Sequence, residues 1–230
     1  MKLYNAQFTN DAHDVHFILT NLEEGIRPLR FQLFGIAFEG NSFDNFRLSC
    51  KQDAPVAREM FHLVHYGAPQ NNIYELQQYT ITVKIPVAAQ RCSDDDLITG
   101  ILTARIRVET DEQDRMMETS LTLDGRCYTA VPNRSRFEDC LMDLHRQLAG
   151  QYRLRCCFTC QYSDYSPFGH DEFGTMNCFF DQRARYRTVH NKKQYLNLLD
   201  ECAAPFVQET YLCGQFTPRN HNEGYRGFLE

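Results

Sequence analysis

Hydrophobic and polar side chains alternate along much of the first 130 residues. Tyr79–Ile85 and Leu102–Val108 both have a two-residue period, and Pro86 is expected to end the first of these segments. Such alternation is typical of strands with one face on a core and the other in water. Further strands are expected at 30–38, 43–48, 119–123 and 127–130, with Asp124-Gly125 as a hairpin turn. This part of the chain therefore predicts an antiparallel sheet or sandwich.

A helix is predicted at 55–66, because Pro55 suits a first helical turn. That helix would place His62 and His65 one turn apart. Since no third ligand adjoins them, we expect packing or surface roles for both rather than metal binding.

The pattern changes near residue 135. Ser135 and Glu138 form a capping box, and apolar residues then recur at helical spacing from Phe137 to Leu148. A second helix is expected after Asn191 and before Pro205, and strands at 152–158, 176–180 and 206–216. The fold class predicted is α+β: a β-rich antiparallel lobe at 1–133 followed by a cysteine-rich α/β lobe at 134–230. The two lobes could also form one continuous domain.

The composition narrows the class of partner. Hydrophobic residues make up 43% and charged residues 23%, as in globular proteins, and the net charge is -6 with a pI near 5.8. General nucleic-acid or anionic-membrane binding is disfavoured, because both need a basic surface. No run of about 18 apolar residues predicts a membrane span, and the N-terminus has no secretory pattern. We therefore expect a cytoplasmic protein.

Ten cysteines are present, and six of them lie within the last 80 residues. In a reducing compartment this clustering favours metal or redox chemistry over disulfides. Cys157 and Cys160 form a C-x2-C knuckle, and Cys178 and Cys213 fall in strand-like segments. Together they predict a four-thiolate zinc site with the spacing C-x2-C-x17-C-x34-C.

Other interpretations of the cysteines stay open. Cys156 and Cys202 compete as ligands, although Cys156 would face away from Cys157 in an extended segment and Cys202 lies on an apolar helix stripe. All six cysteines could instead be small buried hydrophobic residues. A redox pair is disfavoured, because this C-x2-C does not open a helix after a strand.

The segments CCFTCQYSDYSPFGHDEFGTMNCF, VQETYLCGQFTPR and GYRG resemble a family of uncharacterised bacterial proteins, a domain of unknown function. The resemblance extends over most of the chain. It implies cysteines at the four positions named above, and so favours Cys213 over Cys202. The chain departs from the family pattern in its extra Cys156, and in Glu223 where a smaller residue is expected. The resemblance implies a site and no reaction.

Two further groups suggest function. Arg183, Arg185 and Arg187 alternate with other residues, so an extended chain would align three guanidinium groups on one face. Such a face could dock an acidic partner or a phosphate, or simply protect a solvated edge strand. Asp164 and His170, in the loop 163–174, could form an acid/base pair, and Glu209 would lie near Cys213 on a shared strand face.

The sequence thus favours a non-catalytic, cytosolic protein-binding protein stabilised by a structural zinc. A toxin-neutralising immunity role would suit its class. The alternative is a hydrolase or transferase that uses Asp164, His170 and Glu209.

Overall fold

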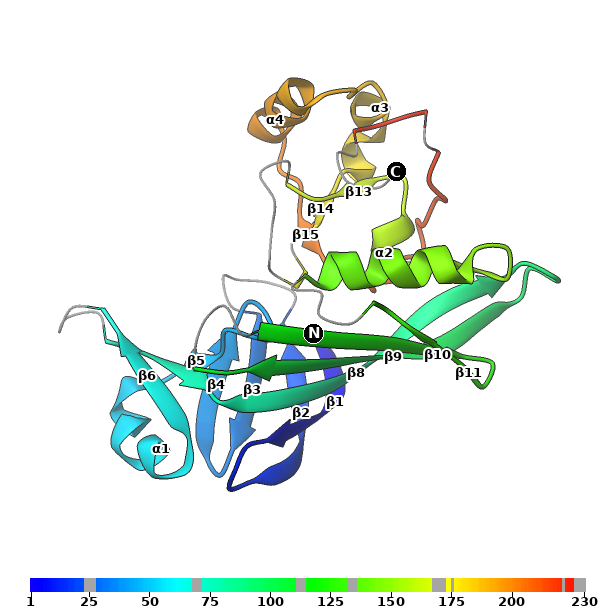
Figure 1. The fold of residues 1–230 in the computed structure, drawn as a ribbon. Helices are drawn as coiled ribbons and strands as arrows, with labels where there is room; N and C mark the ends of the chain where they lie inside the picture. Colours follow the sequence, from blue (N-terminus) through cyan, green and yellow to red (C-terminus); the bar gives the residue numbers. More distant parts are fainter. Residues whose placement is uncertain are drawn as a thin grey trace. The chain divides into compact units, whose positions relative to one another are not determined.

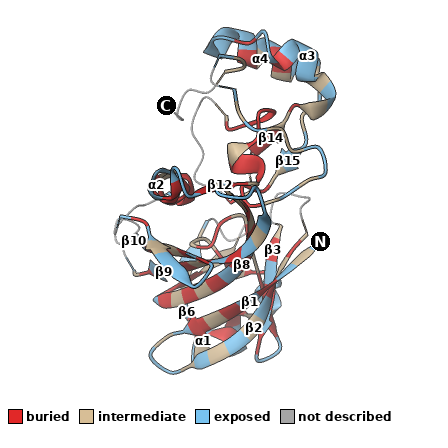
Figure 2. Ribbon diagram, turned by 90° about the vertical axis from the view of Figure 1, so that its right-hand side faces the viewer, coloured by how far each residue is buried: buried red, intermediate tan, exposed pale blue. Residues whose placement is uncertain are grey.

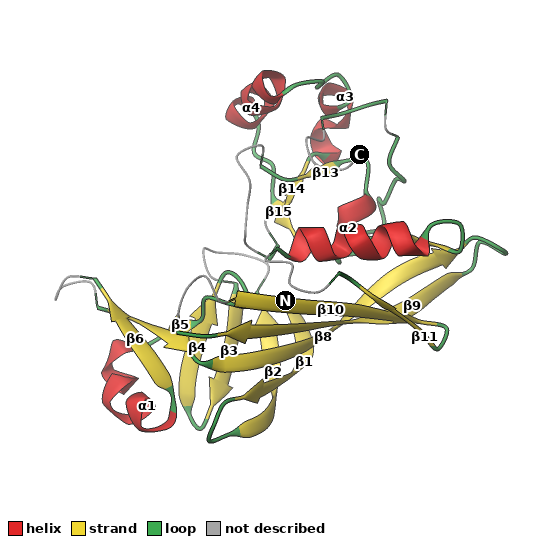
Figure 3. Cartoon of the chain, viewed as in Figure 1, coloured by secondary structure: helices red, strands yellow, loops and turns green. Residues whose placement is uncertain are grey.

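The computed structural model describes residues 1–22, 28–67, 72–110, 115–131, 136–166, 173–174, 176–220 and 222–225. Within these residues the protein combines antiparallel strands with a few helices (Figures 1 and 3), so the predicted α+β class is confirmed. The chain forms two compact units. Unit 1 contains residues 1–85, 102–120 and 129–140; unit 2 contains 86–101, 121–128 and 141–230. These units interleave along the sequence, whereas the predicted lobes are consecutive.

Unit 1 is built on a sheet in the order β10-β9-β8-β1-β2-β3-β4-β5-β7-β6. The strands within it are β1 Lys2–Thr9, β2 Asp14–Asn21, β3 Leu29–Leu33, β4 Ile36–Gly40, β5 Arg47–Leu48, β6 His62–Tyr66 and β7 Ile73–Gln77. Three long strands, β8 Tyr79–Arg91, β9 Leu97–Val108 and β10 Arg115–Leu123, begin in one unit and end in the other. The two alternating segments of the sequence lie in β8 and β9, as predicted.

The inward positions of these strands form the core of unit 1. Buried and less buried residues alternate along β8 (Figure 2), as the two-residue period requires. The aromatic rings of Phe8 and Phe38 each meet that of Phe61 edge-on, at 5.7 and 5.2 Å. All three side chains are buried. Burial of each contributes roughly 1.5–3 kcal/mol of hydrophobic free energy.

The segment 30–38, predicted as one strand, is a hairpin. Phe34 and Gly35 separate β3 from β4 with φ of 52° and 83°. Two positive φ values match the twist of a two-residue hairpin turn, a conformation that glycine adopts easily and phenylalanine rarely. The turn was missed because Phe34 continues the apolar pattern. The predicted turn at Asp124-Gly125 is confirmed, with φ of 47° and 75°.

Pro86 does not end its strand, contrary to the prediction. Pairing of β1 with β8 stops at Lys84, and pairing of β8 with β12 starts at Ala89. Ala88 accepts a hydrogen bond from Arg155 N on the β12 side, and residues two apart point the same way. The nitrogen of Pro86 therefore faces a gap in the ladder, where a missing N–H costs no hydrogen bond.

The helix predicted at 55–66 is also shorter than expected. A 3₁₀ turn at Lys51–Asp53 leads into helix α1, Ala54–Met60, and strand β6 follows from His62. His62 and His65 consequently lie in a strand, where an odd separation puts their side chains on opposite faces. The two imidazoles cannot share a metal ion through this spacing.

Unit 2 holds the ends of β8, β9 and β10, in the order β11-β10-β9-β8 with β12 beside β8, and a smaller sheet in the order β13-β14-β15. Its elements include β11 Arg126–Thr129, α2 Phe137–Leu148, β12 Tyr152–Leu154, β13 Ser163–Asp164, β14 Met176–Cys178, α3 Arg183–Tyr186, α4 Lys192–Glu201 and β15 Phe206–Val207, with 3₁₀ turns at Cys157–Thr159 and Phe180–Gln182. The first residues of α2 and the last of β11 belong to unit 1.

Both predicted helices of this region are confirmed. The apolar stripe of α2 is buried, and Asn191 caps α4 by accepting a hydrogen bond from Gln194 N at 3.0 Å. The predicted cap Ser135 lies outside the described residues. No helix in the described part of the chain is long and apolar enough to cross a membrane.

Candidate metal centre

The C-x2-C segment forms a tight turn. Residues Cys157–Thr159 make one 3₁₀ turn between two extended residues, Cys156 and Cys160. The amide of Cys160 donates to the carbonyl of Cys157 at 3.0 Å, which reverses the chain direction. A turn of this kind brings the two thiols of a C-x2-C pair to the same side, the arrangement that a tetrahedral metal site uses. The predicted strand 152–158 is accordingly limited to Tyr152–Leu154.

Two segments from farther along the chain are bonded to this knuckle. Cys157 N donates to Tyr211 O and Phe158 N to Glu209 O, both at 2.8 Å. On the other side, Cys160 forms a bridge with Pro218, and Gln161 N donates to Thr217 O at 2.8 Å. Cys213 lies between these two anchored stretches. The knuckle therefore fixes both ends of the short segment that carries the fourth cysteine.

Cys178 is brought in by the small sheet. It pairs with Ser163 across β13 and β14, and the Ser163 hydroxyl donates to the carbonyl of Cys157. Cys178 N also donates to Pro205 O at 2.9 Å. The four predicted ligands thus come from three segments, the knuckle itself and the two that carry Cys178 and Cys213, which are joined around the knuckle by hydrogen bonds.

The thiols of these residues interact electrostatically. The pKa of Cys157 is raised above its ordinary value, first by burial and then by the nearby thiols of Cys156, Cys160, Cys213 and Cys178. Burial also raises the pKa of Cys178, and Cys160 and Cys213 add to the effect. None of the ten cysteines forms a disulfide bond. Among the described residues, however, no three His, Cys, Asp or Glu side chains are arranged as they stand to hold a metal ion.

The competing cysteines have other surroundings. The Sγ of Cys202 donates to Leu198 O at 2.9 Å at the end of α4, and the residue packs against an apolar cluster that includes Tyr195. Cys156 is fully buried, and burial raises its pKa to about 11. The helix ends one residue before Cys202, which is its extended C-cap and not a helix-face residue as predicted; the predicted apolar surroundings are confirmed.

The strand predicted at 206–216 is wrong beyond its first two residues. Only Phe206–Val207 is a strand, and turns follow in which Tyr211 N donates to Gln208 O and Phe216 N to Cys213 O, each at 3.2 Å. Glu209 and Cys213 therefore do not share a strand face. Burial in this segment does not follow the alternation of the sequence, because polar Gln208–Thr210 are all buried while apolar Phe206 and Leu212 are exposed. Periodicity alone therefore predicted the wrong structure.

The proposed acid/base residues serve as internal hydrogen-bond acceptors. Asp164 is 1% exposed and accepts from Tyr186 Oη and Tyr165 N, both at 2.9 Å. Glu209 is also 1% exposed; it accepts from Gly174 N at 2.9 Å and from Tyr165 Oη at 3.2 Å. His170 lies outside the described residues. These contacts use the two carboxylates to hold loops.

The three arginines are exposed, but they do not form the predicted strand face. Residues 183–186 are helix α3, which points successive side chains in different directions. Arg183 lies over the ring of Phe180, Arg185 pairs with Glu201, and Arg187 pairs with Glu223 at 3.1 Å. The prediction failed because alternation of Arg with other residues fits a strand and a short helix equally well.

Sequence reasoning missed Arg219. Its Nη2 donates to the carbonyls of Cys160 and Ser163, at 2.7 and 2.8 Å. Burial lowers its pKa, and the nearby Tyr186 and Asp164 oppose that effect. Nothing in the sequence pattern marks this residue, because it lies in a segment without regular structure.

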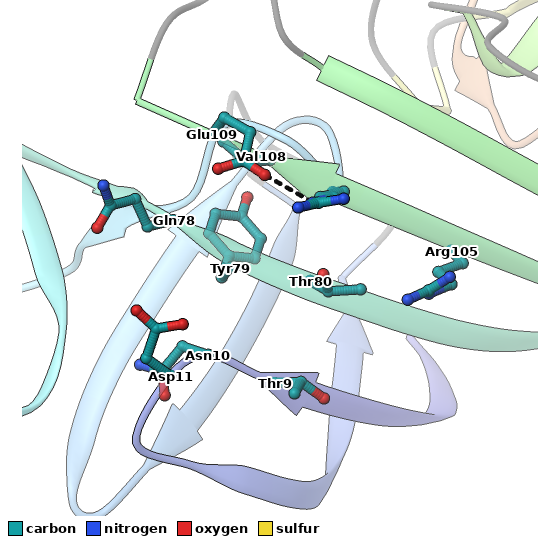
Figure 4. Close-up of a pocket in the computed structure, with 10 residues that line it drawn as sticks. Thr9, Asn10, Asp11, Gln78, Tyr79, Thr80, Arg105, Val108 and Glu109 are labelled. Atoms are coloured by element: carbon teal, nitrogen blue, oxygen red, sulfur yellow. Dashed lines mark ion pairs between the residues drawn. The ribbon is translucent and has the colours of Figure 1, made fainter.

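Unit 1 has an open polar groove of about 470 Å³ (Figure 4), lined by Thr9–Asp11, Gln78–Thr80, Arg105 and Arg107–Glu109. Arg107 pairs with Glu109 at 2.6 Å, and Arg105 with Glu118 at 3.1 Å. All four side chains are at least 39% exposed. Because these charges are paired with each other and solvated, the groove favours no particular ligand, and the cysteine-rich unit carries the stronger candidate site.

The model of a family of unknown function (DUF6304) matches residues 2–163. The match includes Cys157 and Cys160 and stops before Cys178 and Cys213. No curated protein and no solved structure matches the chain.

Proposed function

This chain belongs to the family of unknown function DUF6304, and we propose that it is a non-catalytic protein-binding protein whose cysteine-rich unit is stabilised by a structural zinc. The zinc ligands are Cys157, Cys160, Cys178 and Cys213. The partner surface is formed by the exposed basic residues of α3 and of the start of α4. Membership was expected from the sequence; the zinc and the partner are proposals.

The single observation that carries the metal proposal is the meeting of three cysteine-bearing segments, with four cysteines among them, at one turn. Each segment is held there by backbone hydrogen bonds, so the convergence does not depend on a metal. Cys157 and Cys160 are buried, while Cys178 and Cys213 are partly exposed. The site thus has an entry path for an ion, together with the four soft ligands that structural zinc prefers.

Electrostatics supports a cation at this place. The pKa values of Cys157 and Cys178 are raised, chiefly by burial and then by neighbouring thiols, so these two thiols stay neutral without a counter-charge. A divalent ion reverses the balance, because thiolates that coordinate zinc are deprotonated outright. In structural zinc sites of this kind each sulfur lies about 2.3 Å from the metal.

The basic surface supports a protein partner. Arg183, Arg185 and Arg187 are exposed, and Lys192 and Lys193 follow at the start of α4. The existing pairs with Glu201 and Glu223 lie at the surface, where an ion pair is worth only about 0–1 kcal/mol. Carboxylates of a partner can replace them at little cost. A toxin neutralised by this protein would be one such partner.

Binding is favoured over hydrolysis because of how the candidate carboxylates are used. Asp164 and Glu209 each accept at least two hydrogen bonds from groups of the protein, and both are almost fully buried. A general acid or base must reach a substrate. Because both carboxylates are used inside the protein to hold loops, they favour a binding function over a catalytic one.

The metal proposal is tested by elemental analysis of protein purified without added metal. About one zinc per chain is expected, and it should be lost in Cys157→Ser and Cys160→Ser. Cys202→Ser is the matched control, since this partly buried cysteine caps α4 and donates to its Leu198 carbonyl, and its loss should leave the zinc in place. Less than about a tenth of an equivalent in the native protein, with the four thiols open to titration, would refute the site.

The partner proposal is tested by charge reversal. A protein captured from a lysate by the native chain should be lost from Arg183→Glu/Lys192→Glu/Lys193→Glu and kept by Arg153→Glu, an exposed arginine on β12. A zero-length carbodiimide reagent should join Lys192 or Lys193 to carboxylates of that protein. Cross-links confined to other lysines, or equal capture by both variants, would contradict the proposed surface.

A further inference from the structure

The chain after Cys213 crosses back over the knuckle as an irregular strap, described at residues 217–220 and 222–225. Gln161 donates through Nε2 to Glu223 O at 3.0 Å, and Tyr186 donates through Oη to Tyr225 O at 3.0 Å. Gly224 N donates to Arg187 O at 3.4 Å. The strap has no regular secondary structure of its own over most of its length, so these bonds to other segments define its path.

Arg219 is the charged residue of this strap that reaches the knuckle. One nitrogen, Nη2, donates to two carbonyls, those of Cys160 and Ser163. Cys160 carries a proposed ligand, and Ser163 pairs with Cys178, which carries another. A single guanidinium therefore holds the backbone at one ligand and at the neighbour of a second.

Burying the Arg219 guanidinium beside the knuckle is unfavourable, and its hydrogen bonds to the two carbonyls offset this. The Nε of Arg219 is buried and has no hydrogen-bond partner within the described residues. Leaving a buried donor unsatisfied is unfavourable, whereas a charged donor to a carbonyl makes one of the stronger hydrogen bonds. The guanidinium is thus kept beside the cysteines by the bonds to Cys160 and Ser163.

From this geometry, and resting on the zinc site proposed above, we infer that Arg219 is a positioning residue for the metal. It fixes the carbonyls on either side of Gln161-Tyr162 and so orients the Cys160 thiol toward the other three ligands. Its positive charge also lies close to a centre that is negative when one zinc binds four thiolates. Partners that orient the ligands of a metal commonly change its affinity 10–100-fold when they are removed.

The inference is tested by the rate at which zinc passes to a chromogenic chelator. Arg219→Met should release zinc about 10–100-fold faster than the native protein, and Arg219→Lys should fall between them, because an ammonium keeps the charge and can reach a carbonyl. With Co²⁺ in place of zinc, the visible absorption of the tetrahedral site should change in Arg219→Met and recover in part in Arg219→Lys.

Arg155→Met is the matched control. Arg155 belongs to the same unit, has a buried Nε without a partner in the described part of the chain, and lies over the ring of Phe216 at 4.4 Å. It donates to a side chain, Gln90, and not to the knuckle carbonyls. This change should lower the urea midpoint but alter zinc release by less than about twofold.

The outcomes separate the two proposals. Native protein that holds no zinc would overturn the zinc site and this inference with it. Native protein that holds zinc, with equal release from the Arg219→Met and Arg155→Met variants, would overturn only the role of Arg219. If Arg219→Met does not fold, release from Arg219→Lys at the native rate would overturn it as well.

Discussion

Replacing Gly224 by alanine should destabilise the protein more than the same change at Gly150. Both glycines have positive φ, 78° and 79°, so both alanines carry the strain of a left-handed backbone. A Cβ at Gly150 meets nothing within 4 Å, while one at Gly224 would lie 2.6 Å from Cε1 of Tyr186. The pair therefore separates backbone strain from a steric clash.

The ring of Tyr186 has little freedom to move aside. It is fully buried and stacks on Phe179 with centroids 4.8 Å apart. Its hydroxyl shares one proton between Asp164 Oδ2 and the carbonyl of Tyr225, at 2.9 and 3.0 Å. Moving the ring loses these contacts, and moving the strap loses the bond to Tyr225. Either response weakens the packing around the strap.

The expected magnitudes follow from these two terms. A left-handed backbone destabilises an alanine by roughly 1–2 kcal/mol. Because alanine also lowers the conformational entropy of the unfolded chain, the net loss of folding free energy at Gly150 should be about 1 kcal/mol. Overpacking adds about 1–3 kcal/mol at Gly224, giving about 2–4 kcal/mol in total. Urea titration followed by circular dichroism measures both midpoints at equal protein concentration. Equal midpoints for Gly224→Ala and Gly150→Ala would show that Tyr186 does not pack against the strap.

Three other predictions concern separate parts of the chain. Removing zinc with a chelator should expose amides of residues 153–216 to hydrogen exchange before those of β1–β4. Cys157→Ser should reproduce this order of exchange, and Cys202→Ser should not. Simultaneous loss of hydrogen-exchange protection in both units would contradict the prediction. The pKa of Asp94 is lowered chiefly by its hydrogen bond from Arg91, so this carboxylate stabilises the fold above its unfolded pKa and the contribution disappears as pH falls through the folded value. From neutral pH to about pH 3 the native protein should therefore lose more stability than Asp94→Asn, and parallel urea midpoints would argue against the pair. Gly100→Ala places a Cβ 2.6 Å from the carbonyl of Thr122 in a neighbouring strand, and should cost about 1–3 kcal/mol by the same urea assay; no loss would show that the backbones are farther apart.

The cysteine-rich segments illustrate how far a site can be predicted from sequence. The C-x2-C pair is local, so its turn follows from the spacing of Cys157 and Cys160. Cys178 was predicted from an expected strand at 176–180, of which Met176–Cys178 is present. Cys213 was predicted from an expected strand at 206–216, of which only Phe206–Val207 is present, and from a family resemblance. They nevertheless lie around the knuckle, because amides of the knuckle and of β13–β14 bond to their segments.

The sequence by itself determined the elements whose period is long and regular. β8, β9, α2 and α4 each repeat their apolar positions over many residues, and one buried face is enough to specify them. Membership of a family of unknown function was likewise predicted from the residues, and the DUF6304 match confirms it for residues 2–163. The motifs beyond residue 163 stay predictions.

Only the tertiary structure decided the short and irregular parts. Pro86 continues a strand because its nitrogen faces the gap between the described pairings of β8 with β1 and with β12. Arg183–Tyr186 is a helix although its residues alternate. Arg219 acquires its role from two carbonyls more than fifty residues earlier in the chain. Such features depend on hydrogen bonds and packing between distant segments, which a local pattern does not encode.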